Sequence, residues 1–352
     1  MQNNKVSPRS GWLRTLAGGL LATLATALHA APPLPPLGAP AELTVSGISS
    51  GGYMAVQYHV AHARTVRGAG VLAAGPYLCA GGSTLAAMYN CMNPGAWTPL
   101  PATATLHADT RALAARGRID DPAALAGSRV WLFSGTRDAT VSPGVVQALA
   151  DYYKGFVRPG DIHLENTVAA GHAMITTDYG GACNTTASPY INDCDFDAAH
   201  ALLQHLLGPL APAGADQDGQ LISFDQKEFT AGQPGAIALD DSGYAYIPNT
   251  CRAGGCRVHI AFHGCRQGAE TLGDTFARHA GYNRWAASNR LIILYPQAIP
   301  RHGWGNWSAP NFVYNPRGCW DWWGYTGSDY ASRNAPQIKA IRAMVDRLTT
   351  PP

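Results

Sequence analysis

The chain has 352 residues, of which 14% are charged, and its formal net charge is +2. Three basic residues and no acidic residue lie in the first 30 positions, so residues 31–352 carry a net charge near −1. No dense run of lysine and arginine follows, which excludes the electrostatic footprint of a nucleic-acid-binding protein. The low charged fraction, with 39 glycines and 25 prolines, favours an exported enzyme over a disordered chain.

The N-terminus has the pattern of an export signal. Lys5, Arg9 and Arg14 precede an apolar stretch at 16–28, and small residues end at Ala30. The stretch is too short and too rich in alanine, glycine and threonine to span a bilayer well, although an uncleaved anchor is the alternative. We expect a signal peptide over 1–30, export to the extracellular space or the periplasm, and no membrane association after cleavage.

All eight cysteines follow this signal, and an even number of cysteines in an exported chain favours disulfides. The spacing suggests three local pairs and leaves one long-range pair, although many other connectivities are open: Cys79–Cys91, Cys183–Cys194, Cys251–Cys256 and Cys265–Cys319. A zinc site is the competing interpretation, but the chain has no C-x-x-C pair. We expect four disulfides, no metal and no cofactor.

The pentapeptide Gly-Ile-Ser-Ser-Gly at 47–51 has the form G-x-S-x-G. A strand-like segment containing Leu43 and Val45 precedes it, and a helix-like run over 52–60 follows. This is the context of a nucleophile elbow, whose turn is too tight for side chains at the two glycines and which exposes the serine. We interpret Ser49 as the nucleophile of a serine hydrolase, with an ordinary Gly/Ser turn as the alternative.

Strand-like and helix-like segments alternate after this motif. The alternation predicts a largely parallel sheet. The expected strands cover 68–75, 129–136 and 161–168, and the expected helices cover 143–156 and 196–207.

Three reactive residues follow expected strands, namely Ser49, Asp138 and His172. Reactive residues of parallel α/β sheets gather on loops at the carboxyl ends of strands. The chain order Ser…Asp…His is that of α/β-hydrolases. Serine needs a neighbouring imidazole to take its proton, and a carboxylate must orient that imidazole and stabilise its cation. The pattern favours a catalytic triad.

Two members of this triad have rivals. Asp138 could instead cap the helix that begins near Pro143, and Asp178 is a second candidate acid. Four other histidines compete with His172, three of them within an expected strand or helix, where a structural role is favoured. They are His163, His200, His205 and His263. Loop position favours Asp138 and His172.

About 18 mature residues precede Ser49, although most α/β-hydrolases have several strands before the elbow. The C-terminal half supplies strand-like segments at 221–229, 242–248, 257–262 and 291–295, and helix-like segments at 270–289 and 330–348. We therefore predict an α/β protein with a single-domain, circularly permuted α/β-hydrolase fold and a largely parallel central sheet. Its catalytic domain, 31–352, consists of a triad-bearing half (31–207), a linker (208–220) and an oxyanion-loop and Trp-rich half (221–352).

The segment 259–267 reads as a strand that ends in a turn at His263-Gly264. The turn can aim the N–H of Cys265 at a substrate oxygen, together with the N–H of Ser50. Two fixed donors at a developing oxyanion usually contribute strongly to acyl transfer. A Cys265–Cys319 bridge would hold this loop rigid, and an ordinary strand end is the alternative.

Five of the nine tryptophans fall within one short stretch: Trp304, Trp307, Trp320, Trp322 and Trp323. The glycines, prolines and asparagines around them, over 300–327, indicate a loop. A Trp-rich loop beside Cys319 could form an apolar binding wall, but these side chains could equally pack in the core.

Five ordered motifs cover nearly the whole mature chain: GISSGGYMA from 47, SGTRDATV from 134, GH from 171, HIAFHGCRQ from 259 and NPRGCWDWWGY from 315. Together they resemble extracellular poly(3-hydroxybutyrate) depolymerases, and most closely the subgroup with a circularly permuted catalytic domain. The resemblance implies Ser49 as nucleophile, Asp138 as acid and His172 as base. It also implies the N–H groups of Ser50 and Cys265 as oxyanion donors.

The same resemblance implies that a tryptophan just after Cys319 lines the substrate cleft. Trp323 is our first candidate and Trp320 the second, and Trp307 and His263 complete the set of candidate substrate-binding residues.

We therefore expect a secreted, monomeric serine esterase that hydrolyses poly(3-hydroxybutyrate), related short-chain polyhydroxyalkanoates and their oligomers. Many family members append a linker and a polymer-binding domain, whereas this chain ends at Pro352, so we expect amorphous polymer or soluble oligomers as substrates. A feruloyl or acetyl esterase and a catalytically inactive Trp-rich binding protein are the alternatives.

Overall fold

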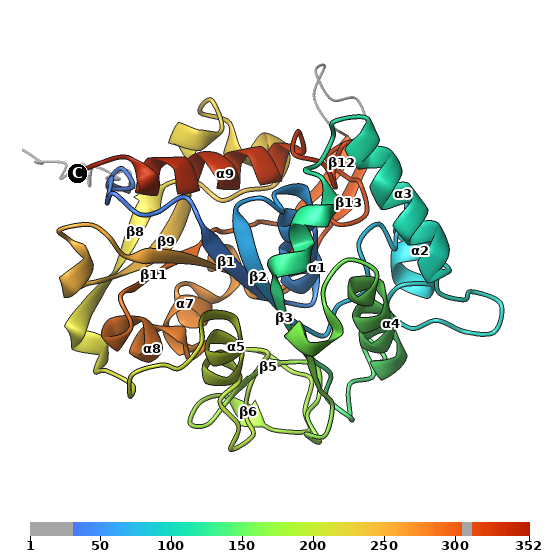
Figure 1. The fold of residues 1–352 in the computed structure, drawn as a ribbon, viewed down its shortest axis with the longest axis horizontal. Coiled ribbons are helices and arrows are strands. Elements are labelled where there is room, and N and C mark those ends of the chain that lie inside the picture. The colour runs from blue at the N-terminus through green and yellow to red at the C-terminus, as the bar shows by residue number, and fades with distance from the viewer. Residues whose placement is uncertain (1–30, 305–311) are drawn as a thin grey trace, which may run out of the picture. The chain divides into compact units, whose positions relative to one another are not determined.

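A central eight-stranded sheet organises the protein. The computed structural model describes residues 31–304 and 312–352, and residues 31–352 form one compact unit. The strand order is β4-β3-β2-β1-β10-β11-β9-β8 (Figure 1). The strands are β1 (Leu43–Ile48), β2 (Val66–Leu72), β3 (Arg129–Phe133), β4 (Ile162–Glu165), β8 (Gly219–Asp225), β9 (Ser242–Pro248), β10 (Arg257–Phe262) and β11 (Leu291–Tyr295).

Six neighbouring strands, from β4 to β11, are parallel, and β9 and β8 extend the sheet antiparallel at one edge. The central strands β1 and β11 are buried along their whole length. Strands covered on both faces are expected to be apolar runs, as Leu291–Tyr295 is. The expected α/β class and largely parallel sheet are confirmed.

Helices cover both faces of the sheet. One face packs against α1 (Ser50–Ala61), α3 (Thr103–Ala115), α4 (Pro143–Lys154) and α9 (Pro336–Thr349). The other packs against α5 (Ala198–Leu207), α7 (Thr275–His279) and α8 (Tyr282–Ser288). Each face therefore has its own large apolar cluster, and a small third cluster lies around Val145. No helix in 31–304 or 312–352 is long and apolar enough to cross a membrane.

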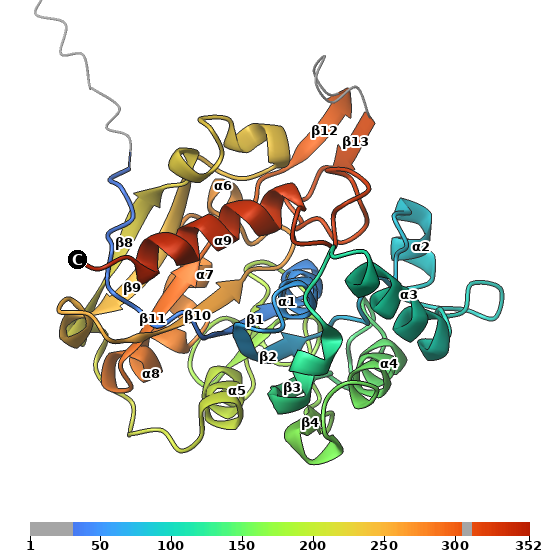
Figure 2. The ribbon, with the colours of Figure 1, turned by 45° about the horizontal axis from the view of Figure 1, so that its top comes forward.

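Several smaller elements surround the carboxyl ends of the parallel strands. They are α2 (Thr84–Tyr89), the β12–β13 hairpin (Arg301–Trp304 and Phe312–Asn315), and a small sheet of β5 (Met174–Thr176), β6 (Gly181–Ala182) and β7 (Ile191–Asp193). Figure 2 shows the hairpin reaching away from the sheet.

The expected helix over 270–289 is wrong as a single element. The chain instead forms α6 (Ala269–Leu272), α7 and α8. Gly273 and Gly281 separate them with φ angles of +60° and +88°, which interrupt a right-handed helix and which glycine adopts without strain. The last helix starts at Pro336, not near 330, because proline fits the first turn of a helix. The strand expected over 221–229 ends at Asp225.

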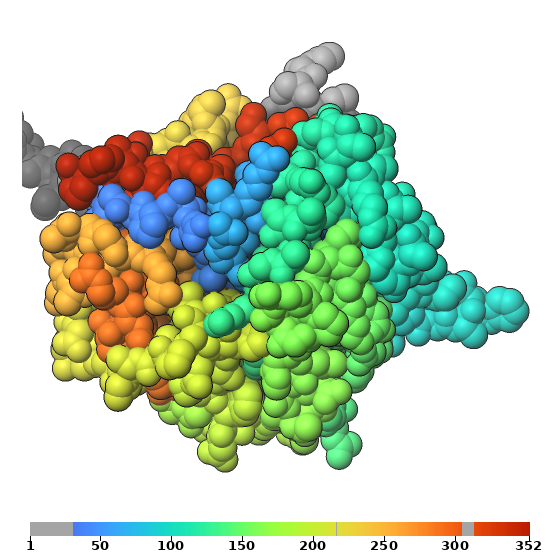
Figure 3. All heavy atoms as spheres, viewed as in Figure 1, coloured from blue at the N-terminus to red at the C-terminus, as the bar shows by residue number. Residues whose placement is uncertain are grey.

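The two ends of the compact unit lie together. The N–H groups of Leu37 and Ala39 both donate to the carbonyl of Leu348, at 3.3 and 2.9 Å. Figure 3 shows this N-terminal segment lying along α9. The expected signal peptide, 1–30, lies outside the described residues.

The structure contains four disulfides, which join the pairs expected from the spacing: Cys79–Cys91, Cys183–Cys194, Cys251–Cys256 and Cys265–Cys319. Three close short loops, and the fourth joins residues 54 positions apart. No group of metal-ligating residues occurs in the parts of the chain that the structure describes.

Candidate active site

The turn between β1 and α1 presents Ser49 at the carboxyl end of the sheet. Its backbone has φ 56° and ψ −123°, a conformation that costs energy in a residue other than glycine. The Ser49 N–H donates to the carbonyl of Leu72 on the adjacent strand, at 2.9 Å. A Cβ at Gly47 would lie 2.2 Å from the carbonyl oxygen of Gly51, and a Cβ at Gly51 would lie 2.3 Å from that of His263. Only glycine fits at these two positions.

Asp138 and His172 are brought together by the loops that follow β3 and β4. His172 Nδ1 lies 2.7 Å from Asp138 Oδ2, and the two side chains are 9% and 1% exposed. Asp138 Oδ1 accepts the N–H groups of Thr140 and Val141, at 2.8 and 2.9 Å. Because both carboxylate oxygens are bonded, the carboxylate is fixed and holds the Nδ1 proton of the imidazole. The other ring nitrogen of His172, Nε2, then carries a lone pair that can accept a proton.

The rival residues are engaged elsewhere. Asp178 is exposed and pairs with Arg284 at 3.0 Å. Among the histidines, the ring of His200 stacks on Trp285, and that of His205 bonds to a backbone carbonyl. His163 is on β4 and stacks near Trp131.

The expected role of His263 in substrate binding is wrong, because this side chain is fully buried. Its Nδ1 donates to the carbonyl of Gly264 at 2.7 Å, and its Nε2 accepts the N–H of Ala298 at 3.0 Å. Burial lowers the pKa of His263 to about 4, so the ring is neutral. His263 shapes the strand end and does not line the pocket.

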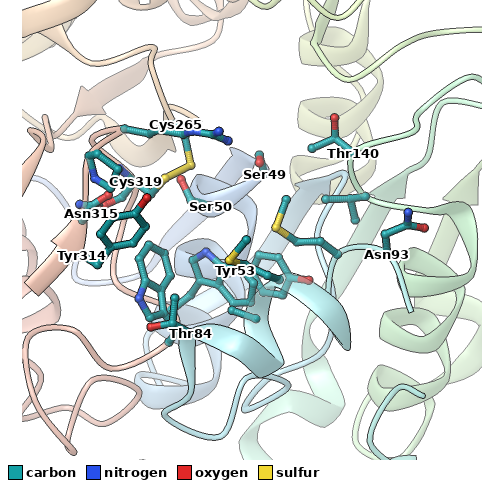
Figure 4. A pocket seen from close by; sticks show the side chains of 18 residues that line it. Ser49, Ser50, Tyr53, Thr84, Asn93, Thr140, Cys265, Tyr314, Asn315 and Cys319 are labelled. Carbon is teal, nitrogen blue, oxygen red and sulfur yellow. Dashed lines mark hydrogen bonds between the residues drawn. A yellow bond between two sulfur atoms is a disulfide. The ribbon is translucent and has the colours of Figure 1, made fainter. Parts of the chain in front are cut away.

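The loop 263–267, which we call the oxyanion loop after the role expected of Cys265, packs against the turn that carries Ser49. A Cβ at Gly264 would lie 3.5 Å from Ser49 Cβ. Among the described residues, none accepts a hydrogen bond from the Cys265 N–H. Figure 4 shows Ser49 and Ser50 beside the Cys265–Cys319 disulfide.

His172 stands at the start of a small substructure within this unit, the His172 lobe, which we define as 171–194. Its β5, β6 and β7 pair in a small sheet, and the Cys183–Cys194 disulfide closes it. The His172 N–H donates to Thr186 Oγ1 at 2.9 Å. The lobe therefore fixes the backbone that carries the imidazole.

A cavity of about 350 Å³ opens in front of Ser49, Ser50 and Cys265. Trp322 and Trp323 line it, as do the methionines at 88 and 92. Arg317 is the one charged side chain among its described lining residues. The cavity therefore suits an uncharged, largely apolar ligand.

Of the two candidate tryptophans after Cys319, only one lines the cavity. Trp323 lines the cavity, but the second candidate, Trp320, is wrong: it is fully buried, and its Nε1 donates to the carbonyl of His263 at 3.0 Å. Trp322, which was not a candidate, lines the cavity beside Trp323. Its ring stacks on that of Tyr53, with ring centroids 3.8 Å apart. The candidate Trp307 lies outside the described residues.

Asp321 gives the Trp-rich loop its shape. Its buried carboxylate accepts the N–H groups of Gly324 and Tyr325 on one oxygen and that of Thr326 on the other, at 2.7, 3.0 and 2.8 Å. Burial raises the pKa of Asp321, while these hydrogen bonds oppose the rise. The turn directs Trp322 into the cavity. A D-x-x-G-x-T pattern at 321–326 was the signal in the sequence that could have suggested it.

Comparisons with known proteins agree with this geometry. A poly(3-hydroxybutyrate) depolymerase of Delftia acidovorans is 42% identical over 356 aligned residues, which cover 97% of this chain and 68% of that protein. A polyhydroxybutyrate depolymerase of Talaromyces funiculosus is 35% identical over 340 aligned residues, which cover 94% of this chain and 96% of that protein. The chain belongs to the poly(3-hydroxybutyrate) depolymerase family. No family model matches it.

Solved structures of poly(3-hydroxybutyrate) (PHB) depolymerases match the fold. One is a serine-to-alanine variant complexed with an R3HB trimer, with a TM-score of 0.80 and 34% identity over 90% of this chain and 98% of that chain. The other, from Penicillium funiculosum, also has a TM-score of 0.80, with 33% identity and the same coverage. The resemblance to poly(3-hydroxybutyrate) depolymerases, stated from the motifs, is confirmed.

The tight turn at Ser49 predicts that adding one methyl group at Gly51 will destabilise the protein. In this PHB depolymerase family member, Gly51→Ala should sharply lower Tm and ester hydrolysis, because the new Cβ would meet the carbonyl of His263 at 2.3 Å. Gly144→Ala, at the second residue of α4, is the control: a Cβ there meets nothing within 4 Å, so Tm and activity should not fall. Thermal unfolding gives the Tm of each variant, and an ester assay gives its activity. An unchanged Tm in Gly51→Ala would contradict the tight turn.

Proposed function

We propose that Ser49, His172 and Asp138 form the catalytic triad of a secreted serine esterase that hydrolyses poly(3-hydroxybutyrate), related short-chain polyhydroxyalkanoates and their oligomers. The observation that carries the proposal is the buried pair of His172 Nδ1 and Asp138 Oδ2, 2.7 Å apart, in a chain whose nucleophile turn opens on an apolar cavity. The membership of the chain in the PHB depolymerase family supports the substrate.

The mechanism follows from the roles of the three side chains. His172 Nε2 takes the proton of Ser49 Oγ as the oxygen attacks the ester carbonyl, and Asp138 stabilises the resulting imidazolium. The N–H groups of Ser50 and Cys265 hold the negative oxygen of the tetrahedral intermediate. His172 then returns the proton to the leaving alcohol, which leaves an acyl group on Ser49. In the second half-reaction His172 takes a proton from water as the water oxygen attacks the acyl-enzyme. It then returns this proton to Ser49 Oγ as the bond to the acyl group breaks and a carboxylic acid is released.

The residues that line the cavity are a further argument for a polyester substrate. A 3-hydroxybutyrate chain carries methyl branches and ester groups but no charge between its ends. The stacked Trp322 and Tyr53, with Trp323, offer flat apolar faces to such a chain. The matching solved structure with a bound R3HB trimer supports the same ligand class here.

The circular permutation also belongs to this proposal. When the strands are counted from β8, their order across the sheet becomes 1-2-4-3-5-6-7-8, and β1 becomes the fifth strand. In that count β10 is the third strand, and α/β-hydrolases take their second oxyanion donor from the loop after the third strand. Cys265 follows β10. Residues 208–220 then join the original chain ends within one catalytic domain, 31–352.

We also propose that a signal peptide at 1–30 directs export of the protein. Four disulfides within 79–319 support it, because disulfides persist in oxidising compartments outside the cytosol.

The first experiment tests the enzyme and its export together. The full chain is expressed, and its culture medium is assayed for clearing of a poly(3-hydroxybutyrate) suspension. Ser49→Ala should lower the rate by several orders of magnitude with little change in Tm, because the triad acts as a unit. Asp138→Asn should also be strongly impaired, whereas Asp178→Asn, which breaks only an exposed ion pair, should keep its activity. Near-normal clearing by Ser49→Ala would refute the nucleophile, and turnover of a feruloyl ester alone would refute the substrate.

The second experiment tests the tryptophan wall. Trp323→Ala should lower polymer and trimer hydrolysis by about tenfold or more, but p-nitrophenyl butyrate hydrolysis by less than about threefold, because the small ester needs no flanking units. Trp97→Ala, in a side chain that is 96% exposed and outside the cavity lining, is the control. Equal losses on both substrates with a lower Tm would make Trp323 a core residue instead.

The third experiment tests the permutation. A chain that starts at Gly219, runs to Pro352, continues through a short Gly/Ser linker into Ala31 and ends at Gly208 should fold and hydrolyse esters. The hydrogen bonds of Leu37 and Ala39 to Leu348 show that the joined ends are close. An insoluble or unfolded product would count against an original chain start at β8.

A further inference from the structure

The side chain of Gln267 joins two loops that are distant in the sequence. It lies at the end of the oxyanion loop and reaches the His172 lobe. The proposed base is on the lobe and one proposed oxyanion donor is on the loop. The distance between these groups therefore depends on the contacts that the loop and the lobe make with each other.

The amide of Gln267 uses both of its N–H donors and its oxygen in this junction. Its Oε1 accepts the N–H of Gly264 at 2.7 Å, and its Nε2 donates to the carbonyls of Pro189 and Tyr190, at 3.2 and 2.9 Å. The side chain is 1% exposed, so water cannot replace these bonds without a rearrangement. Arg266 adds a second contact to Tyr190, but that bond is exposed to solvent.

One carbonyl links the amide to the base. The Tyr190 oxygen accepts both Gln267 Nε2 and the N–H of Met174, at 2.8 Å, and Met174 is two residues from His172. On the other side, Gln267 accepts the N–H of Gly264, the residue directly before Cys265, whose N–H is the proposed oxyanion donor.

We propose that Gln267 is a positioning residue, which sets the separation between the His172 imidazole and the Cys265 N–H. This inference rests on the proposed function. Gln267 does not touch the reacting atoms, and it acts through Gly264 and Tyr190. A shift of about 1 Å in an oriented catalytic group can lower a rate by about 10²-fold, so one side chain between two loops can control turnover.

The rival interpretation is that Gln267 only satisfies buried backbone groups. Gln226 provides the control, because it is also fully buried and makes the same kind of contacts. Its Oε1 accepts the N–H of Gln297 at 3.0 Å, and its Nε2 donates to the carbonyls of Asp240 and Gln297, at 2.8 and 3.1 Å. Gln226 joins segments that carry none of the proposed catalytic residues.

The experiment compares Gln267→Met with Gln226→Met in the full chain. Methionine keeps the length of the side chain and removes its hydrogen bonds, so both variants should lose stability to a similar extent. Only Gln267→Met should lower kcat for p-nitrophenyl butyrate, by about 10- to 100-fold, with KM changed less than about threefold. If Gln267→Met does not fold, Gln267→Glu is measured instead, since it keeps an acceptor for the Gly264 N–H but loses the amide donor.

Three outcomes separate the possibilities. A lower kcat at unchanged KM in the Gln267 variant alone supports the inference. Equal kcat losses in both variants, or a loss in KM alone, would overturn it and leave the proposed function intact. An inactive wild-type chain, or a Ser49→Ala variant as active as wild type, would instead overturn the proposed function itself.

Discussion

The absence of side chains at Gly47 and Gly51 is the constraint on which the rest of the site depends. A Cβ at Gly51 would collide with the carbonyls of both Phe262 and His263, so the turn after β1 and the end of β10 are packed backbone against backbone. Ser49, the proposed nucleophile, therefore lies next to the loop that carries Cys265, the proposed oxyanion donor, because no side chain separates the two backbones. The Cys265–Cys319 disulfide and the bond from Trp320 Nε1 to the carbonyl of His263 then hold the loop from the other side.

The places of Ser49, Asp138 and His172 in the fold could be predicted because short, local patterns mark them. A G-x-S-x-G turn between a strand and a helix, an acid after β3 and a histidine after β4 each mark a loop at the same edge of a parallel sheet. The buried bond between His172 and Asp138 is consistent with that logic. The cysteine pairing could be predicted for a similar reason, because three of the four pairs are close in the sequence.

The rest depends on local backbone conformation, which composition and apolar spacing do not specify. Composition marked 304–323 as rich in tryptophan, but it could not tell that Trp320 packs under the loop while Trp322 faces the cavity. That choice is made by the buried hydrogen bonds of Asp321. Likewise, the apolar spacing over 270–289 suggested one helix, and only the backbone shows that Gly273 and Gly281 divide it.

The strand order has a consequence for the folding of the chain. β1 lies at the centre of the sheet, yet one of its two neighbours, β10, comes so late that the bonded side chains of Thr44 and His259 are 215 residues apart. Until that segment has left the ribosome or the export channel, one edge of this fully buried strand has no partner. An unpaired apolar edge invites pairing with another chain, and pairing over such a distance is slow. Export of the chain in an unfolded state would postpone this hazard until both halves are present together.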